Sequence, residues 1–180
     1  DWVCIAMYGA NSPWSKALLE MVREMGGKEE STILAHKDRV PSANAAMVNA
    51  VMSLSYDMSD TYPRVELHPS CSVIASAMSV AEKNNVSGKD LITAVVAGYE
   101  IITRVSEAMN RRPESYSAVR GFEANSIFPP FGAVTVAGKL LNLNKKEMIN
   151  ALGLTGGSMG ASSIEYLLDG NWTYRWNSGR

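Results

Sequence analysis

Residues 87–100 read SGKDLITAVVAGYE, and this stretch decides the fold. Ser87 followed by Asp90 three residues later is typical of a helix start, where each residue's side chain can bond the other's backbone N–H. Beyond that start, apolar residues recur at helical spacing. They are Leu91, Ile92, Val95, Tyr99, Ile102, Val105 and Met109. The pattern predicts that the longest helix of the chain begins at this point.

Similar helix signals occur on both sides of this stretch. Ser12-Pro13 is typical of a helix start, Gly26-Gly27 of its end, and Asn144 with Glu147 predicts another start. Further helical patterns occupy residues 43–54, 73–81 and 131–141. Residues 31–34 form a short extended piece at most. The sequence therefore predicts an all-α fold with at least six helices and under about a tenth of its residues in strands, well below the usual share.

The composition indicates an ordinary globular chain. Of its 180 residues, 46% are hydrophobic, and the formal net charge is -1. Since neither sign of charge is in excess and the apolar runs are short, we expect neither a nucleic-acid partner nor a membrane partner. Cys4 and Cys71 lack the spacing of a zinc site or a disulfide framework. Two isolated thiols favour a reducing, cytoplasmic location, and we expect no metal.

One polar loop carries the residues best suited to acid–base chemistry. His68, one of two histidines, follows Asp57, Asp60 and Thr61 and directly precedes a helical pattern. Histidine titrates near neutral pH, and a junction between loop and helix can present it to a ligand. The two aspartates could equally cap turns. His36, which lies in a charged turn, is interpreted as a surface residue.

The glycine-rich segment 153–160 differs from a phosphate-binding loop. It lacks the Gly-Lys-Ser/Thr ending of such a loop, and it follows a helix, whereas a phosphate-binding loop follows a strand. We therefore interpret its glycines as positions where two helices pack closely together.

The two ends of the sequence suggest an internal piece of a longer enzyme. Residues 1–8 already read as part of a buried helix, without the features of a signal peptide, and Arg180 follows a tryptophan-rich segment directly. In such a piece, surface normally covered by later chain would be apolar. We expect dimerisation or an exposed patch there, with Trp172 and Trp176 as its candidates.

Read in order, six stretches resemble the N-terminal, helical part of the MmgE/PrpD family. They are SANAAMVNA (42–50), DMSDTYPRVELHPS (57–70), GKDLITAVVAGYE (88–100), GFE (121–123), FGAVTVAGKLL (131–141) and ALGL (151–154). The resemblance covers essentially the whole chain. It implies a single helical domain over residues 1–180, the large domain of a two-domain enzyme whose C-terminal α+β domain is absent from this sequence.

The resemblance also implies an activity. Members of this family are cofactor-independent enzymes, typically homodimers, that act on small di- and tricarboxylates by dehydration, decarboxylation or epimerisation. Each reaction moves a proton at carbon next to a carboxylate. The family's histidine falls on His68, which is the expected proton-transfer group. The Asp and Thr of its DxDDT-like loop fall on Asp57, expected to orient the imidazole or act as a base, and on Thr61, expected to bond a substrate carboxylate.

Two segments depart from the family pattern. Many relatives have histidine after Gly-Phe, where this chain has Glu123, and a Lys-Arg-Leu-His-like segment where it has Tyr174, Arg175 and Asn177. An added anion and lost cations would weaken tricarboxylate binding, because unpaired like charges in a cleft are costly. We expect Glu123 and Tyr174 to contact substrate, and Arg120 or Arg175 to bind a carboxylate. A solvated basic loop is the alternative for the arginines.

Three functions remain open from the sequence. The first is a lyase, either a dehydratase or a decarboxylase, that acts on a small carboxylic acid. The second is an isomerase that epimerises an amino- or iminodicarboxylate, and it would use the same proton-transfer groups. The third is a helical dimerisation module without catalysis. We predict the lyase, and we expect the 180-residue piece alone to be inactive.

Overall fold

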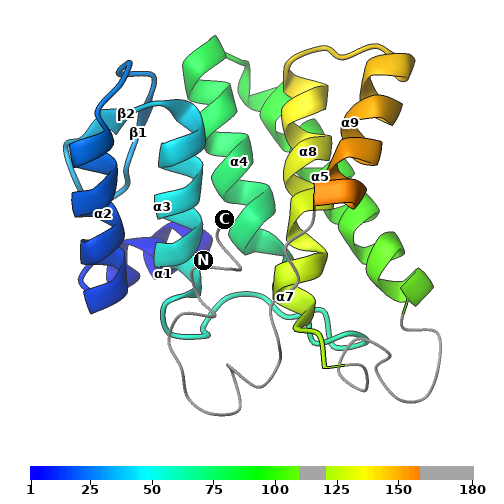
Figure 1. Ribbon diagram of the computed structural model, residues 1–180, viewed down its shortest axis with the longest axis horizontal. Helices are drawn as coiled ribbons and strands as arrows, with labels where there is room; N and C mark the ends of the chain where they lie inside the picture. The colour runs from blue at the N-terminus through cyan, green and yellow to red at the C-terminus, as the bar shows by residue number, and fades with distance from the viewer. Residues whose placement is uncertain (110–120, 159–180) are drawn as a thin grey trace.

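Helices account for most of the structure. It is a computed structural model and describes residues 1–109 and 121–158 (Figure 1). Its helices are α1 (Trp2–Gly9), α2 (Pro13–Met25), α3 (Ser42–Leu54), α4 (Pro69–Asn84), α5 (Gly88–Met109), α7 (Ala124–Ile127), α8 (Pro129–Leu140) and α9 (Lys145–Ser158). Strands β1 (Ser31–Thr32) and β2 (Arg39–Val40) form a small antiparallel pair. The predicted all-α fold is confirmed, and none of the described helices has the length and apolarity to cross a membrane.

Capping hydrogen bonds are present at the predicted starts of α2, α5 and α9. Ser12 caps α2 as expected. The hydroxyl oxygen of Ser87 accepts the backbone N–H of Asp90 at 3.2 Å, and the hydroxyl donates to the Asp90 carboxylate at 2.7 Å. At α9 the reciprocal pair is complete, because Asn144 accepts the N–H of Glu147 at 3.1 Å and Glu147 accepts that of Asn144 at 2.8 Å. Local side chains therefore determine where these helices begin.

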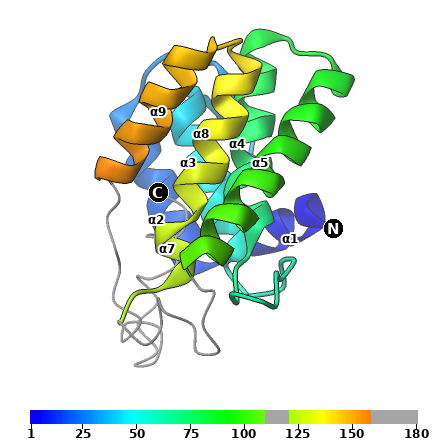
Figure 2. The same cartoon turned by 90° about the vertical axis from the view of Figure 1, so that its right-hand side faces the viewer.

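Helix α4 lies at the centre of the domain. It packs against α3 on one side and against α5 and α8 on the other, while α1 and α2 contact α3 and α9 contacts α8 (Figures 1 and 2). Two main groups of buried apolar side chains fill these contacts. One includes Val22 and Val51, on the side of α2 and α3, and the other includes Ile102 and Phe128, on the side of α5 and α8. Since α4 borders both sides, it connects them.

Close helix contacts around α4 depend on two glycines. A Cβ added to Gly98 of α5 would lie 2.6 Å from a methyl carbon of Val136 and 2.9 Å from one of Val73. A Cβ on Gly132 of α8 would lie 2.7 Å from the other methyl carbon of Val73. All three distances are too short for real carbon atoms, so the absence of side chains at these two positions lets α4, α5 and α8 pack closely together.

The glycines of α9 behave differently. Open space surrounds the position of a Cβ on Gly153 and Gly157, and at Gly156 the nearest atom is the Cζ of Phe131 at 4.0 Å. The interpretation of segment 153–160 as a close helix contact is therefore wrong for the glycines that the structure describes. Small residues look alike in sequence whether a neighbouring helix covers them or not.

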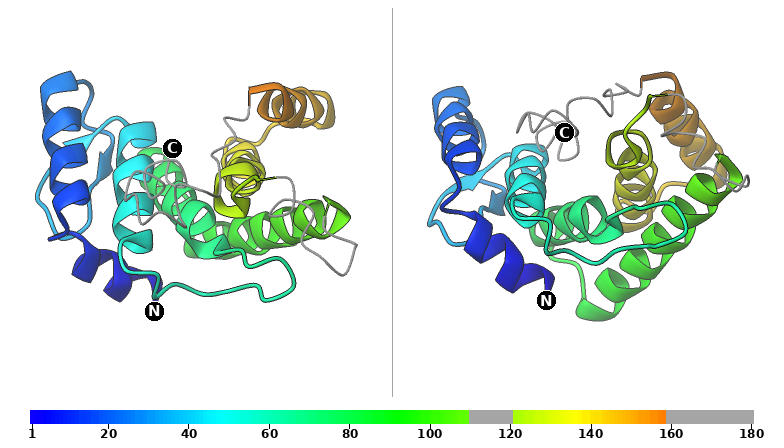
Figure 3. Two further views of the ribbon diagram at one scale, coloured as in Figure 1. Left: turned by 60° about the horizontal axis from the view of Figure 1, so that its bottom comes forward. Right: turned by 90° about the horizontal axis from the view of Figure 1, so that it is seen from below.

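The chain between α3 and α4, residues 55–68, is an irregular connection, as predicted. Seen from below (Figure 3, right), it runs out towards α5 and returns to the start of α4. At the end of α5, Glu107 accepts a hydrogen bond from the Tyr62 hydroxyl and pairs with Arg64 at 2.9 Å. These contacts fix the outer part of the loop, and the returning part carries the predicted site.

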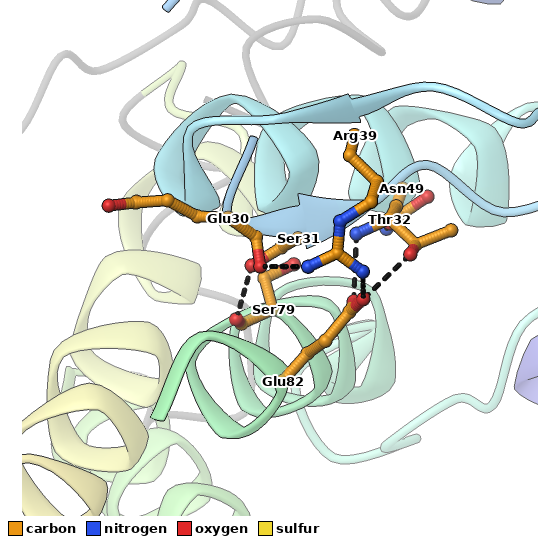
Figure 4. A network of polar contacts seen from close by, with 7 residues as sticks. All are labelled: Glu30, Ser31, Thr32, Arg39, Asn49, Ser79 and Glu82. Atoms are coloured by element: carbon orange, nitrogen blue, oxygen red, sulfur yellow. Dashed lines mark hydrogen bonds and ion pairs between the residues drawn. The ribbon is translucent and has the colours of Figure 1, made fainter. Parts of the chain in front are cut away.

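A polar network attaches the strand pair to α4 (Figure 4). The carboxylate of Glu82 accepts the N–H and the hydroxyl of Thr32 and the guanidinium of Arg39, each at 2.7 Å. Nearby, the Ser31 hydroxyl donates to the carbonyl of Ser79 at 2.6 Å. Partial burial alone would raise the pKa of Glu82, but the bonds from Thr32 and Arg39 outweigh it, so this pKa lies below its ordinary value.

We expect this network to make the fold sensitive to acid. Because the pKa of Glu82 is lower in the folded chain than the value of about 4.3 for a free glutamate, its contacts stabilise the fold fully above that value and progressively less as pH falls towards the folded-state pKa. Glu82→Gln removes the titrating group. The difference in Tm between wild type and this variant should therefore be unchanged above about pH 5 and shrink as pH falls from about pH 5 to about pH 3. A difference that stays constant over that range would contradict the expectation.

Candidate active site

His68 occupies the junction between the loop and α4. Pro69 takes the first helical position, which suits its fixed φ and missing N–H, so the helix begins directly after the histidine. The His68 side chain forms no capping bond with the helix and is half-buried. Its imidazole is therefore available for other contacts.

The contacts of the imidazole select one tautomer. His68 Nδ1 lies 2.9 Å from the carbonyl oxygen of Asp60 and 3.5 Å from the hydroxyl oxygen of Thr61. A carbonyl oxygen only accepts hydrogen bonds, so Nδ1 carries the proton in the neutral ring. Nε2 is then the basic nitrogen. This arrangement suits a group that exchanges a proton with a ligand.

Asp60 supplies the helix cap that His68 does not. One carboxylate oxygen of Asp60 accepts the backbone N–H of Ser70, in the first turn of α4, at 3.1 Å. The other accepts the hydroxyl of Tyr99, from α5, at 2.8 Å. Burial, together with the bond to Asp60, raises the pKa of Tyr99, so this hydroxyl keeps its proton and remains a donor. The turn that faces the imidazole is thus fixed to two helices.

The other two residues predicted from the loop lie on its surface. Thr61 is exposed, and the structure brings its hydroxyl next to His68. Asp57 is also exposed and lies three residues after the end of α3. Its φ of +52° is a left-handed conformation that aspartate tolerates better than most residues. The carbonyl of Asp60 orients the imidazole, which is the role expected for Asp57. Catalysis by Asp57 and Thr61 stays a prediction.

Glu123 lies inside the protein, unlike a residue on the wall of an open cleft. Its exposed fraction is 3%. One carboxylate oxygen accepts the backbone and side-chain N–H groups of Asn125, both at 2.9 Å, and the other accepts the hydroxyl of Ser126 at 2.8 Å. Glu123 is therefore the N-cap of α7. Its charge is directed at protein donors, which differs from the substrate contact that the sequence led us to expect.

Asn125 connects this capped turn to the histidine. Its side-chain carbonyl accepts the backbone N–H of His68 at 2.8 Å. Asn125 is itself buried, with an exposed fraction of 8%. The loop, through Asp60 and Thr61, and α7, through Asn125, therefore both contact His68 directly before α4 begins.

Three of the predicted substrate-binding residues, Arg120, Tyr174 and Arg175, lie outside the described residues. The same holds for Trp172 and Trp176, which we predicted at a dimer surface. Their roles, and the homodimer itself, stay predictions.

A cavity of about 550 Å³ lies beside the contacts that Asp60 makes with Ser70 and Tyr99. It is lined by Asp60, Ser70, Tyr99 and apolar residues that include Ile74. Because His68 is absent from its lining, we do not assign substrate to it. Within residues 1–109 and 121–158, no group of three or more His, Cys, Asp or Glu side chains could hold a metal ion.

Three residues support His68 and the turn beside it, namely Tyr99, Asn125 and Asp60. The sequence did not indicate this role for the first two and indicated it only in part for the third. Tyr99 was assigned to the apolar face of its helix, and Asn125 was given no role. For Asp60 we considered a cap of a turn within the loop. It does act as a cap, but of the first turn of α4. The one available signal was the run from Asp60 to His68-Pro69, since histidine is not among the preferred N-cap residues and a helix that begins after it needs a cap from elsewhere.

The fold and the site together define an all-α domain with a histidine on a supported loop. The chain belongs to the MmgE/PrpD family, since the model of the MmgE/PrpD N-terminal domain matches residues 1–180. It is 25% identical over 175 residues to the cis-aconitate decarboxylase-like protein oryM of Aspergillus oryzae, covering 89% of this chain and 35% of that protein. It is 23% identical over 159 residues to the cis-aconitate decarboxylase of Aspergillus terreus, covering 86% and 32%. The chain thus spans about a third of the length of these relatives.

Proposed function

We propose that this chain is the helical domain of a cofactor-independent lyase that acts on a small carboxylic acid. One observation carries the proposal. The Nδ1 of His68 faces the carbonyl of Asp60, which leaves Nε2 as the atom that can exchange a proton. The similarity to cis-aconitate decarboxylases supports a lyase. The activity is proposed for the complete protein, of which this domain supplies the histidine.

The proposed step is a decarboxylation with proton transfer. The bond between carbon and a carboxylate breaks, CO2 leaves, and the electron pair stays on the substrate next to a second carboxylate. His68, as the imidazolium, donates its Nε2 proton to carbon and regains a proton from solvent. Thr61, next to the imidazole, donates its hydroxyl to a substrate carboxylate. Hydrogen bonds of this kind stabilise the charge that develops on the substrate.

The placement of Glu123 bears on the substrate. From sequence, an anion at this position spoke against tricarboxylates. With the carboxylate buried and bonded to Asn125 and Ser126, the part of the objection that rested on this added anion no longer holds. We therefore propose an unsaturated tricarboxylate of the cis-aconitate type as the first substrate to test.

The complete protein can be tested in deuterated water with cis-aconitate, 2-methylcitrate and an iminodicarboxylate. We expect loss of CO2 from the first substrate, with one solvent deuterium on the new C–H carbon of the product, because the protonating group exchanges with solvent. Mass spectrometry and NMR identify both. Exchange of deuterium into a substrate that only epimerises would establish the isomerase. No turnover of any of the three would contradict an enzyme of this class.

A further inference from the structure

The orientation of the Asn125 side chain is fixed by Glu123. The carboxylate of Glu123 can only accept hydrogen bonds, so the group of Asn125 that faces it at 2.9 Å must be the NH2. The carbonyl oxygen of the amide then faces the backbone N–H of His68 at 2.8 Å, where an acceptor is required. Both assignments agree, so the amide has one orientation.

The Glu123–Asn125 pair is buried and connects distant parts of the chain. Exposed fractions are 3% for Glu123 and 8% for Asn125. The pair joins α7 to the residue that precedes α4, and the amide also donates to the carbonyl of Glu66 at 3.4 Å. Helix α7 has four residues, too few to be stable without such contacts. The backbone of His68 is therefore held by a side chain that is itself held by a buried carboxylate.

We infer that Glu123 and Asn125 are positioning residues for His68 and do not bind substrate. The pair fixes the backbone on one side of the histidine, while Asp60 fixes the imidazole on the other. A small shift of this backbone would move Nε2 relative to a bound substrate, and proton transfer is steep in that distance. This inference rests on the proposed function, because it assumes that His68 transfers the proton.

Three substitutions in the complete protein separate this role from substrate binding. Glu123→Ala and Asn125→Ala should each lower kcat by about tenfold to a hundredfold, the size expected for misplacement of a reacting group, with KM changed by less than about threefold. Glu123→Gln should stay near wild type. Its side-chain oxygen can still accept both N–H groups of Asn125, and its NH2 can donate to the hydroxyl oxygen of Ser126. Asn125→Ala leaves the backbone cap of α7 in place, so it remains informative if Glu123→Ala fails to fold.

The matched control is Asn144→Ala. The amide oxygen of Asn144 accepts a backbone N–H in the first turn of α9. Helix α9 begins at the end of the domain opposite the start of α4 (Figure 1). The Asn144→Ala protein should lose stability without loss of kcat. A second readout does not depend on activity: the imidazole NMR signals of His68, assigned with His68→Ala. They should shift in Glu123→Ala and Asn125→Ala and remain in place in Glu123→Gln, while the signals of His36 stay unchanged in all three.

The outcomes distinguish failure of the inference from failure of the proposed function. A Glu123→Ala protein with wild-type kcat and unshifted His68 signals would overturn the inference. So would a change in KM alone, which indicates a substrate contact, or a Glu123→Gln protein as impaired as Glu123→Ala, which indicates that the charge itself is needed. If His68→Ala retains full activity, the proposed function fails, and the NMR signals still decide whether the pair positions His68.

Discussion

Replacing His68 with alanine is expected to lower the lyase activity of the complete protein by about a hundredfold to ten-thousandfold, the usual contribution of a general acid–base group. The His68 side chain is half-buried at the end of the loop that precedes α4, and it forms no capping bond with that helix. Asp60 keeps the cap through Ser70 when the imidazole is removed. The fold should therefore survive the substitution.

Steady-state kinetics and far-ultraviolet circular dichroism of the variant test this expectation together. His36→Ala is the control, because His36 lies in the turn before β2, away from the loop. It should retain the activity of wild type. Full activity in His68→Ala would show that the family's histidine has been assigned to the wrong residue.

Gly9→Ala is expected to have the largest effect on stability. Gly9 ends α1 against α3, and a Cβ there would lie 1.9 Å from the carbonyl oxygen of Met52 and 3.0 Å from the Cβ of Ser55. The clash is with backbone, so no side-chain rotation can relieve it. We expect the free energy of unfolding to fall by about 3 kcal/mol, at the upper end of overpacking effects. For a chain of this size, that lowers Tm by roughly 10 °C.

Thermal unfolding followed by circular dichroism measures the effect. Gly88→Ala is the matched control, because Gly88 starts α5 and nothing lies within 4 Å of its added Cβ. Alanine is the better helix former, so this variant should be as stable as wild type or more stable by up to about 1 kcal/mol. Equal stability of the two variants would mean that α1 does not pack against α3 as described.

The parts of the fold that were predicted from sequence depend on local signals. The starts of α5 and α9 were visible because the capping side chains lie within three residues of each other, at Ser87–Asp90 and Asn144–Glu147. Glycine was less informative. Gly98, which lets α5 approach α4, and Gly153, which faces open space, look alike in sequence. Only the neighbouring helix distinguishes them.

The candidate site follows the same division. The position of His68 was predictable, because the resemblance and the change from a polar loop to a helical pattern both mark it. The residues that support His68 could not be predicted, because they come from distant segments of the chain. Tyr99 is 39 residues from Asp60, and Asn125 is 57 residues from His68. The burial of Glu123 could not be predicted either, because the sequence does not show whether a glutamate at this position caps a helix or faces a substrate.

Chemical rescue of His68→Ala in the complete protein is the direct test of proton transfer by His68. If the lost group is the proton carrier, free imidazole should enter the space that the side chain leaves and transfer the proton in its place. We expect kcat of His68→Ala to rise with imidazole concentration and to saturate, while wild type and Glu123→Ala do not respond. A variant that imidazole cannot rescue, or one stimulated no more than wild type, would contradict proton transfer by His68.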